Sequence, residues 1–330
     1  MSVSLEQIAQ KGGKGPLREI VRSQPFWVTI ALALICVVMS QVSDVFFTED
    51  NFFNVTRNFA FIGIIAIGMT AVIITGGIDL SVGSIVGLSG IVTGLVLHAG
   101  HPLWAGIVAG LLTALACGLV NGILIAYVRL SAFIVTLGMF GIARSLAQVL
   151  SENHMIYEFG PDEKLFFALG GGTIHGFANP FILLIVLVAV FMIVFRYTTW
   201  GRWVFALGGN ENAARLTGVP VNRMKLSVYL LSALMAGISA VLLVGWQGAA
   251  INAMGTGYEL RVIASSVIGG ADLMGGAGGA YGAFIGAALI EVIRNSLLLA
   301  GVDANWEGTF VGLFIVFAVL LSKLRGMRSG

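Results

Sequence analysis

The chain has 330 residues, of which 58% are hydrophobic and only 10% are charged, and its mean hydropathy is +0.96. A soluble domain contains about 25% charged residues, and a soluble fold of this length could not bury so much apolar surface. The composition therefore predicts an integral membrane protein, while a net charge of +2 gives no support for nucleic-acid binding.

A polar, basic N-terminal tail over residues 1–25 precedes ten apolar runs. Several runs approach the ~20 residues that a helix needs to cross the hydrocarbon core. The predicted spans are 26–43, 59–76, 81–98, 103–127, 131–150, 181–198, 225–247, 258–271, 279–299 and 308–322. The sequence thus predicts an all-α polytopic membrane protein with about ten transmembrane helices, a transmembrane domain over 26–322, and a C-terminal tail over 323–330.

The distribution of lysine and arginine predicts the orientation of these spans. With the N-terminus in the cytoplasm, 13 of the 18 basic residues fall in cytoplasmic segments. Those left outside or within spans are Arg57, Arg144, Lys164, Arg261 and Arg294. An even number of spans then places both termini in the cytoplasm.

Two junctions between spans share the pattern GGxDLxxG, at Gly76–Gly83 and Gly269–Gly276. The match is compatible with a parallel internal repeat and equally with chance in a glycine-rich chain. Asp79 and Asp272, the acidic residues of the two motifs, are costly at span ends unless capped, paired or hydrated. They are candidates for a substrate path. The alternative is a helix cap, in which Asp79 or Ser81 caps the span after the first motif and Asp272 caps the span after the second.

Other polar side chains within the predicted spans also suit a hydrated path for a neutral, polyhydroxylated solute. The complete set of candidate path residues is Asp79, Ser81, Asn121, Gln247 and Asn295. Hydrogen bonds between helices are the alternative role for such groups. Glu291 and Arg294, three residues apart on one helix, are expected to form an ion pair.

A short polar interruption, LGGNENAARLTGVP at Leu207–Pro220, separates two apolar runs on the predicted cytoplasmic side. Asn210 can cap a helix there, with Glu211 in its first turn, and Glu211 lies four residues before Arg215, the favourable order for a pair. Gly218 and Pro220 supply a stop. Such a helix is too short to be stable alone, so it is either docked onto a partner or a plain capped loop.

No catalytic or metal-binding motif is evident in the sequence. An intramembrane aspartyl protease needs a glycine-x-glycine-aspartate order, whereas the chain has GGID and GGAD. GGKG at Gly12–Gly15 lacks the ending of a nucleotide-binding P-loop. Cys36 and Cys117 lie in apolar runs, with neither disulfide nor metal spacing. The sequence therefore predicts no enzyme activity, no metal and no cofactor bound by this chain.

Four stretches in order resemble the permease subunits of ribose-type ABC importers, in the branched-chain amino-acid and sugar permease family. They are GMTAVIITGGIDLSVGSIVGLSG (68–90), NGILIAYVRLSAFIVTLGM (121–139), ALGGNENAARLTGVPVNRMKLSVYLLSALMAGISAVLL (206–243) and GYELRVIASSVIGGADLMGGAGG (257–279). The resemblance covers nearly the whole chain after the N-terminal tail. Three departures from the family pattern occur, at Arg261, at Asp272 and at Leu130–Ser131–Ala132, which replaces a typical proline-containing turn.

The resemblance implies a bacterial inner-membrane protein that works with a second permease, identical or different. It also implies two ATP-binding subunits that carry ATP and Mg²⁺, and a periplasmic solute-binding protein. Residues 208–219 match the family's cytoplasmic coupling segment, and we use the name coupling segment for them. The residues expected to contact the ATPase are Glu211, Asn212, Ala213, Ala214, Arg215, Leu216 and Gly218.

The resemblance thus implies import of a monosaccharide or related polyol by alternating access, driven by partner ATPases. Two alternatives stay open from the sequence. One is a secondary transporter coupled to ions through Asp79, Asp272 or Glu291, and the other is a branched-chain amino-acid permease of the same family.

Overall fold

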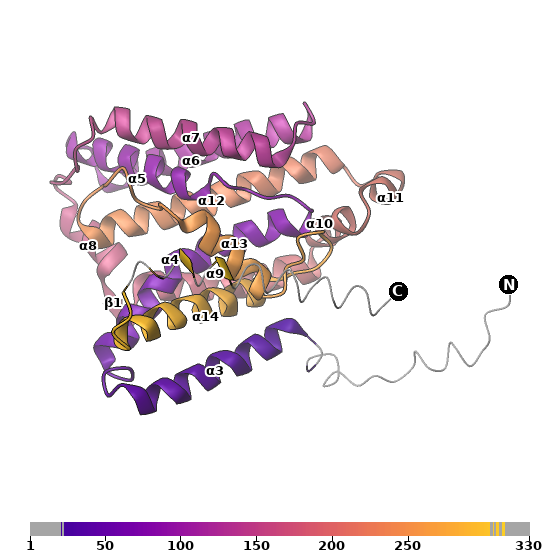
Figure 1. Cartoon of the computed structure of the whole chain (residues 1–330). Helices are drawn as coiled ribbons and strands as arrows, with labels where there is room; N and C mark the ends of the chain where they lie inside the picture. Colours follow the sequence, from indigo (N-terminus) through magenta and orange to yellow (C-terminus); the bar gives the residue numbers. More distant parts are fainter. Residues whose placement is uncertain (1–20, 22, 304–305, 307, 310–311, 314–330) are drawn as a thin grey trace.

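The structure is a computed structural model that describes residues 21, 23–303, 306, 308–309 and 312–313. Most of the predicted N-terminal tail, most of the predicted span 308–322 and all of the C-terminal tail lie outside these residues. Within them the chain is a bundle of helices with one two-stranded hairpin (Figure 1).

The helices and strands follow the chain in a nearly unbroken series. They are α3 (Gln24–Val42), α4 (Glu49–Ile74), α5 (Val82–His98), α6 (Leu103–Ala126), α7 (Ala132–Leu150), α8 (Glu163–Gly171), β1 (Thr173–Ile174), β2 (Phe177–Ala178), α9 (Asn179–Tyr197), α10 (Thr199–Gly209), α11 (Glu211–Leu216), α12 (Val221–Gln247), α13 (Tyr258–Ile268) and α14 (Ala280–Leu299). The strands β1 and β2 are antiparallel, with Thr173 opposite Ala178.

Seven helices among the described residues are long and apolar enough to cross a membrane, judged by length and composition. They are α3, α4, α6, α7, α9, α12 and α14. Two other predicted spans form shorter helices, the 17-residue α5 and the 11-residue α13. The multi-pass helical character predicted from composition is confirmed.

The long helices α4 and α12 form the centre of the bundle, and most of their apolar windows are buried. Glycine permits their close approach, because a Cβ on Gly68 of α4 would lie 2.8 Å from the Cα of Ser232 in α12. The peripheral helices α3, α6, α7 and α9 leave most of their apolar surface uncovered. This arrangement suits a bundle whose outer surface meets lipid or another subunit.

Helix α4 begins ten residues earlier than the predicted span 59–76. Thr48 caps it, with its Oγ1 accepting a hydrogen bond from the Asn51 N–H at 3.4 Å. Glu49 and Asp50 then occupy the first turn, where negative charge suits the helix dipole. The start signal of the helix is therefore the polar stretch Thr48–Asp50, about ten residues before the predicted span.

Helix α13 is shorter than the predicted span 258–271, and the chain before it is irregular. The guanidinium of Arg144 in α7 donates to the carbonyl oxygens of Asn252 and Met254, the latter at 2.9 Å. It also lies 3.4 Å from the Gly83 carbonyl oxygen at the start of α5. These bonds satisfy backbone carbonyls that a non-helical segment inside a membrane protein would otherwise leave unpaired.

Candidate functional site

The coupling segment contains the short helix α11, and its local design is the one that the sequence predicts. The Asn210 side chain caps it by accepting from the Ala213 N–H at 2.9 Å. Gly218 follows with φ of +85°, a left-handed conformation that glycine adopts without strain. The helix has only six residues, because Gly208 and Gly209 belong instead to the end of α10, a helix that the sequence analysis did not predict.

One side of the coupling segment is fixed to the bundle by apolar contacts. Ala214 is 3% exposed and packs with Leu207, Val219, Val221 and Met224. Ala214 therefore faces the bundle, which contradicts its assignment as a contact to an outside partner. Of the other residues in that set, Asn212, Ala213, Arg215, Leu216 and Gly218 are exposed and Glu211 is partly exposed. Leu216 stands out, since 89% of this apolar residue is exposed.

An ion pair holds the same segment to the start of α12. The Glu211 carboxylate accepts from Arg215 Nη2 at 3.1 Å, as predicted, and from Lys225 Nζ at 2.7 Å. The hydrogen bond from Lys225 lowers the pKa of Glu211 below its ordinary value, with further help from Arg215. Lys225 lies fourteen residues away in sequence, so local spacing did not identify it as a partner. The pair with Lys225 orients α11 with respect to α12, whereas the pair with Arg215 lies within α11.

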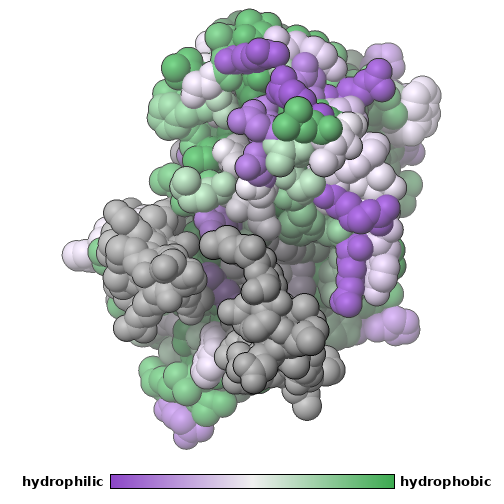
Figure 2. Space-filling view, turned by 90° about the vertical axis from the view of Figure 1, so that its right-hand side faces the viewer, coloured by the Kyte–Doolittle hydropathy of each residue, from purple (hydrophilic) through white to green (hydrophobic). Residues whose placement is uncertain are grey.

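Figure 2 looks at the end of the bundle that carries α11 and shows many hydrophilic side chains gathered over its upper right part. A cavity of about 450 Å³ opens near this end. It is lined by Arg129, Glu211, Asn212, Arg215, Asn222 and Lys225, and by Thr75, Gly76, Gly77 and Tyr229. The coupling segment and the first GGxDLxxG motif thus share one polar cavity.

A second polar site lies inside the bundle, around Asp79. This carboxylate is fully buried and accepts three hydrogen bonds: from the Ser81 N–H at 3.0 Å, from Ser81 Oγ at 2.6 Å and from Ser232 Oγ at 2.8 Å. Asn121 Nδ2 donates to Ser81 Oγ at 2.9 Å. Three of the five candidate path residues, Asp79, Ser81 and Asn121, are therefore in contact, and Ser232 completes the cluster. We call these four residues the Asp79 cluster.

Neither GGxDLxxG aspartate caps the helix that follows its motif. Asp79 Oδ1 accepts a hydrogen bond from the N–H of Ser81, two residues further on. Asp272 Oδ1 likewise accepts from the N–H of Met274, also two residues further on, at 2.9 Å. The two motifs thus form the same local turn. Their surroundings differ, because Asp79 is buried while Asp272 is half-buried beside an exposed Met274.

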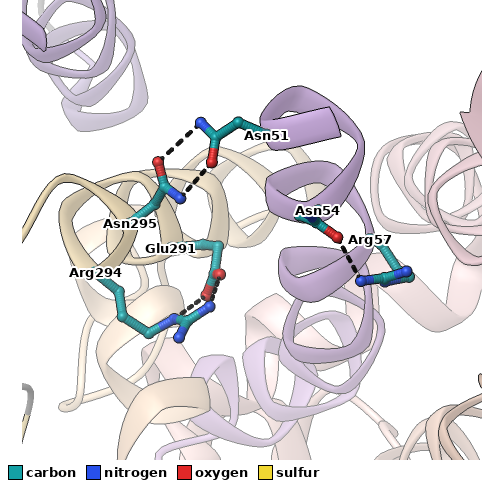
Figure 3. A network of polar contacts seen from close by, with 6 residues as sticks. All are labelled: Asn51, Asn54, Arg57, Glu291, Arg294 and Asn295. Atoms are coloured by element: carbon teal, nitrogen blue, oxygen red, sulfur yellow. Dashed lines mark hydrogen bonds and ion pairs between the residues drawn. The ribbon is translucent and has the colours of Figure 1, made fainter. Parts of the chain in front are cut away.

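The other two candidate path residues lie away from the Asp79 cluster. Asn295 of α14 forms a reciprocal amide pair with Asn51 of α4, at 2.7 and 3.1 Å (Figure 3). The predicted Glu291–Arg294 pair forms on the same helix, α14, and is drawn in the same view. Gln247 is exposed at the C-terminus of α12. Asn295 therefore has the interhelical role that was the alternative for these amides.

These features define a class of protein: a multi-pass membrane bundle with a buried polar cluster and an exposed, anchored helix at one polar end. A family model described as the permease component of a branched-chain amino acid transport system matches residues 51–319. The chain belongs to this permease family.

Three relatives match over most of their length. The "Probable ABC transporter permease protein y4mJ" of Sinorhizobium fredii is 39% identical over 85% of this chain and 83% of its own. The "Ribose import permease protein RbsC" of Escherichia coli is 36% identical over 89% and 92%. The "L-arabinose ABC transporter permease protein AraH" of Azospirillum brasilense is 35% identical over 90% and 87%. The resemblance to ribose-type ABC permeases is confirmed.

Proposed function

We propose that this chain is the membrane-spanning subunit of a binding-protein-dependent importer for a monosaccharide or related polyol. The observation that carries the proposal is similarity over about nine-tenths of the chain to permeases named for ribose and for L-arabinose.

The contacts of the acidic residues argue against an ion-coupled secondary transporter. Asp79 accepts three hydrogen bonds, Glu291 pairs with Arg294, and Asp272 is used in a backbone turn. A carboxylate that carries a proton or sodium ion must change partners during transport. Each of these three already serves a structural contact.

The proposed assembly contains a second permease, two ATPase subunits that carry ATP and Mg²⁺, and a periplasmic solute-binding protein. It lies in the bacterial inner membrane with ten spans and with both tails, 1–25 and 323–330, in the cytoplasm. The coupling segment over 208–219 docks on an ATPase through its exposed residues, Leu216 foremost. ATP-driven closure of the ATPase pair then moves the segment, and the permease pair changes the side to which it is open.

Uptake by proteoliposomes tests the proposed substrate class. The chain is reconstituted with its ATPase and binding protein and offered radiolabelled pentoses, hexoses, polyols and leucine. We expect ATP-dependent uptake of one sugar or polyol and none of leucine. Leucine uptake without sugar uptake would refute the sugar assignment, and uptake driven by an ion gradient without ATPase would refute the ABC mechanism.

The coupling role is tested by reversing a charge on the exposed side of α11. Arg215→Glu removes the pair with Glu211 and alters the docking surface, so we expect loss of transport and of permease-stimulated ATP hydrolysis while the protein still inserts and dimerises. Lys164→Glu, on an exposed residue of α8, is the matched control. Wild-type coupling in Arg215→Glu would contradict the docking role.

A further inference from the structure

Three backbone segments from distant parts of the sequence meet at glycines beside the coupling segment. The Gly276 N–H donates to the Ile74 carbonyl oxygen at 2.8 Å. A Cβ on Gly208, at the end of α10, would overlap that same oxygen and lie 2.5 Å from the Gly276 nitrogen. A Cβ on Gly275 would lie 2.8 Å from the Gly208 oxygen and 3.1 Å from the Gly76 nitrogen. We call Gly76, Gly208, Gly275 and Gly276 the glycine joint.

The joint connects the coupling segment to both GGxDLxxG motifs. Gly76 opens the first motif, and Gly275 and Gly276 close the second. The contacts run from backbone to backbone, with no flexible side chain between them. Close-packed contacts of this kind transmit a displacement rather than absorb it.

Both motifs are stiff enough to move as units. The second is closed by a hydrogen bond from the Asp272 N–H to the Ala277 carbonyl oxygen at 3.1 Å, in addition to the turn made by the Asp272 side chain. The first is held at its far side by Asp79, which Ser232 ties to the middle of α12. A displacement of the glycine joint is therefore transmitted to the Asp79 cluster and to α12.

We infer that Gly208 is a positioning residue through which movement of α10 and α11 is passed to the two GGxDLxxG loops. This inference rests on the proposed function of the coupling segment and adds its mechanical contact inside the permease. A side chain on the neighbouring Gly209 would leave the joint undisturbed, since a Cβ there meets nothing within 4 Å.

The comparison of Gly208→Ala with Gly209→Ala tests the inference with one chemical change at adjacent positions. Alanine favours a helix more than glycine does by about 0.5–1 kcal/mol, so loss of helix α10 does not explain an effect. The complex with its ATPase and binding protein is reconstituted, and solute moved and ATP hydrolysed are measured together. We expect Gly208→Ala to assemble and hydrolyse ATP but to lower the ratio of solute moved to ATP hydrolysed at least about tenfold. Gly209→Ala should stay within about twofold of wild type.

A second pair covers the case in which Gly208→Ala fails to assemble. Gly275 and Gly100 both have left-handed backbones, with φ of +91° and +83°, so alanine strains both alike. A Cβ on Gly100 meets nothing within 4 Å, whereas Gly275 lies in the joint. We expect Gly275→Ala to lower the ratio of solute moved to ATP hydrolysed, as Gly208→Ala does, and Gly100→Ala to leave that ratio unchanged.

The ratio separates a positioning role from a structural one, because a misfolded complex lowers transport and hydrolysis together. Wild-type ratios in the joint variants, or equal losses in the control variants, would overturn the inference and leave the proposed function intact. No ATP-dependent uptake by the wild-type complex would overturn both.

Discussion

The two aspartates of the GGxDLxxG motifs make the same turn and differ in everything around it. Asp79 is fully buried and its second carboxylate oxygen accepts from Ser232. Asp272 is half-buried, and its side chain makes the local bond to the Met274 N–H. A buried carboxylate is retained only with several donors aimed at it, so the two positions should respond differently to one substitution.

Asp79→Asn keeps the shape of the side chain but sets an NH₂ donor either against the two donors of Ser81 or against the hydroxyl of Ser232. A buried mismatch of this kind costs about 1–3 kcal/mol, and we expect a lower thermal unfolding midpoint and reduced uptake. Asp272→Asn retains the oxygen that the turn needs and should change stability by less than about 0.5 kcal/mol. Equal effects of the two substitutions would contradict the assigned roles.

The pairing of Glu211 with Lys225 and Arg215 predicts a pH dependence at the coupling segment. Because the folded-state pKa of Glu211 is lowered, its pairs stabilise the fold above the ordinary glutamate pKa. That contribution disappears as the pH falls through the lowered value. The carboxylate is partly exposed, so solvent screening limits the contribution to at most about 1 kcal/mol.

The difference between the unfolding midpoints of wild type and Glu211→Gln, followed as a function of pH, measures this contribution. We expect a small positive difference at about pH 7 that persists down to the ordinary glutamate pKa and then vanishes below it. A difference that grows on acidification would contradict a lowered pKa of Glu211 in the folded state.

At the scale of elements, one cation supports the irregular chain that precedes the short α13. Arg144 donates to two carbonyls of the 248–257 segment and lies near a third at the start of α5. The single side chain thereby links α7, α5 and the segment that precedes α13. An irregular backbone inside the bundle is stable only while such donors are present.

Replacement of Arg144 by methionine leaves these carbonyls unpaired. Hydrogen bonds to charged groups contribute about 1.5–3 kcal/mol, so we expect a destabilisation of about that size in a reversible unfolding assay. Arg144→Lys should recover part of it, because lysine keeps the charge and one donor nitrogen but lacks the second nitrogen that lies 3.4 Å from the Gly83 carbonyl oxygen. Lys164→Met, on an exposed side chain, should have little effect, and an equal loss there would argue against this role of Arg144.

At the scale of the whole molecule, the two ends of the bundle carry different contacts. One end holds α11, the glycine joint and the polar cavity, and the opposite end holds the hairpin (Figure 1). The excess of lysine and arginine at the α11 end is typical of a cytoplasmic face.

Cysteine labelling in intact cells tests this orientation. In a background without Cys36 and Cys117, single cysteines are placed at Met274 and Met155, which are 86% and 59% exposed at opposite ends. We expect a membrane-impermeant maleimide to label Met155→Cys in intact cells and Met274→Cys only after the membrane is opened. The reverse pattern would place α11 outside the cell and refute its docking on an ATPase.

The sequence alone determined that this is a multi-pass helical membrane protein, because composition and apolar runs show it. The apolar runs also located those spans that coincide with helices of the described residues. Local spacing predicted the Asn210 cap of α11 and its Glu211–Arg215 pair. These features depend on residues a few positions apart and on the solvent that the chain requires. Three other features connect residues that are far apart in sequence: the carbonyl contacts of Arg144, the bond between Asp79 and Ser232, and the glycine joint. Asp79 and Ser232, for example, are 153 positions apart. Only the tertiary structure decided them, because packing selects which distant donor or backbone meets a given group, and no local pattern encodes that choice.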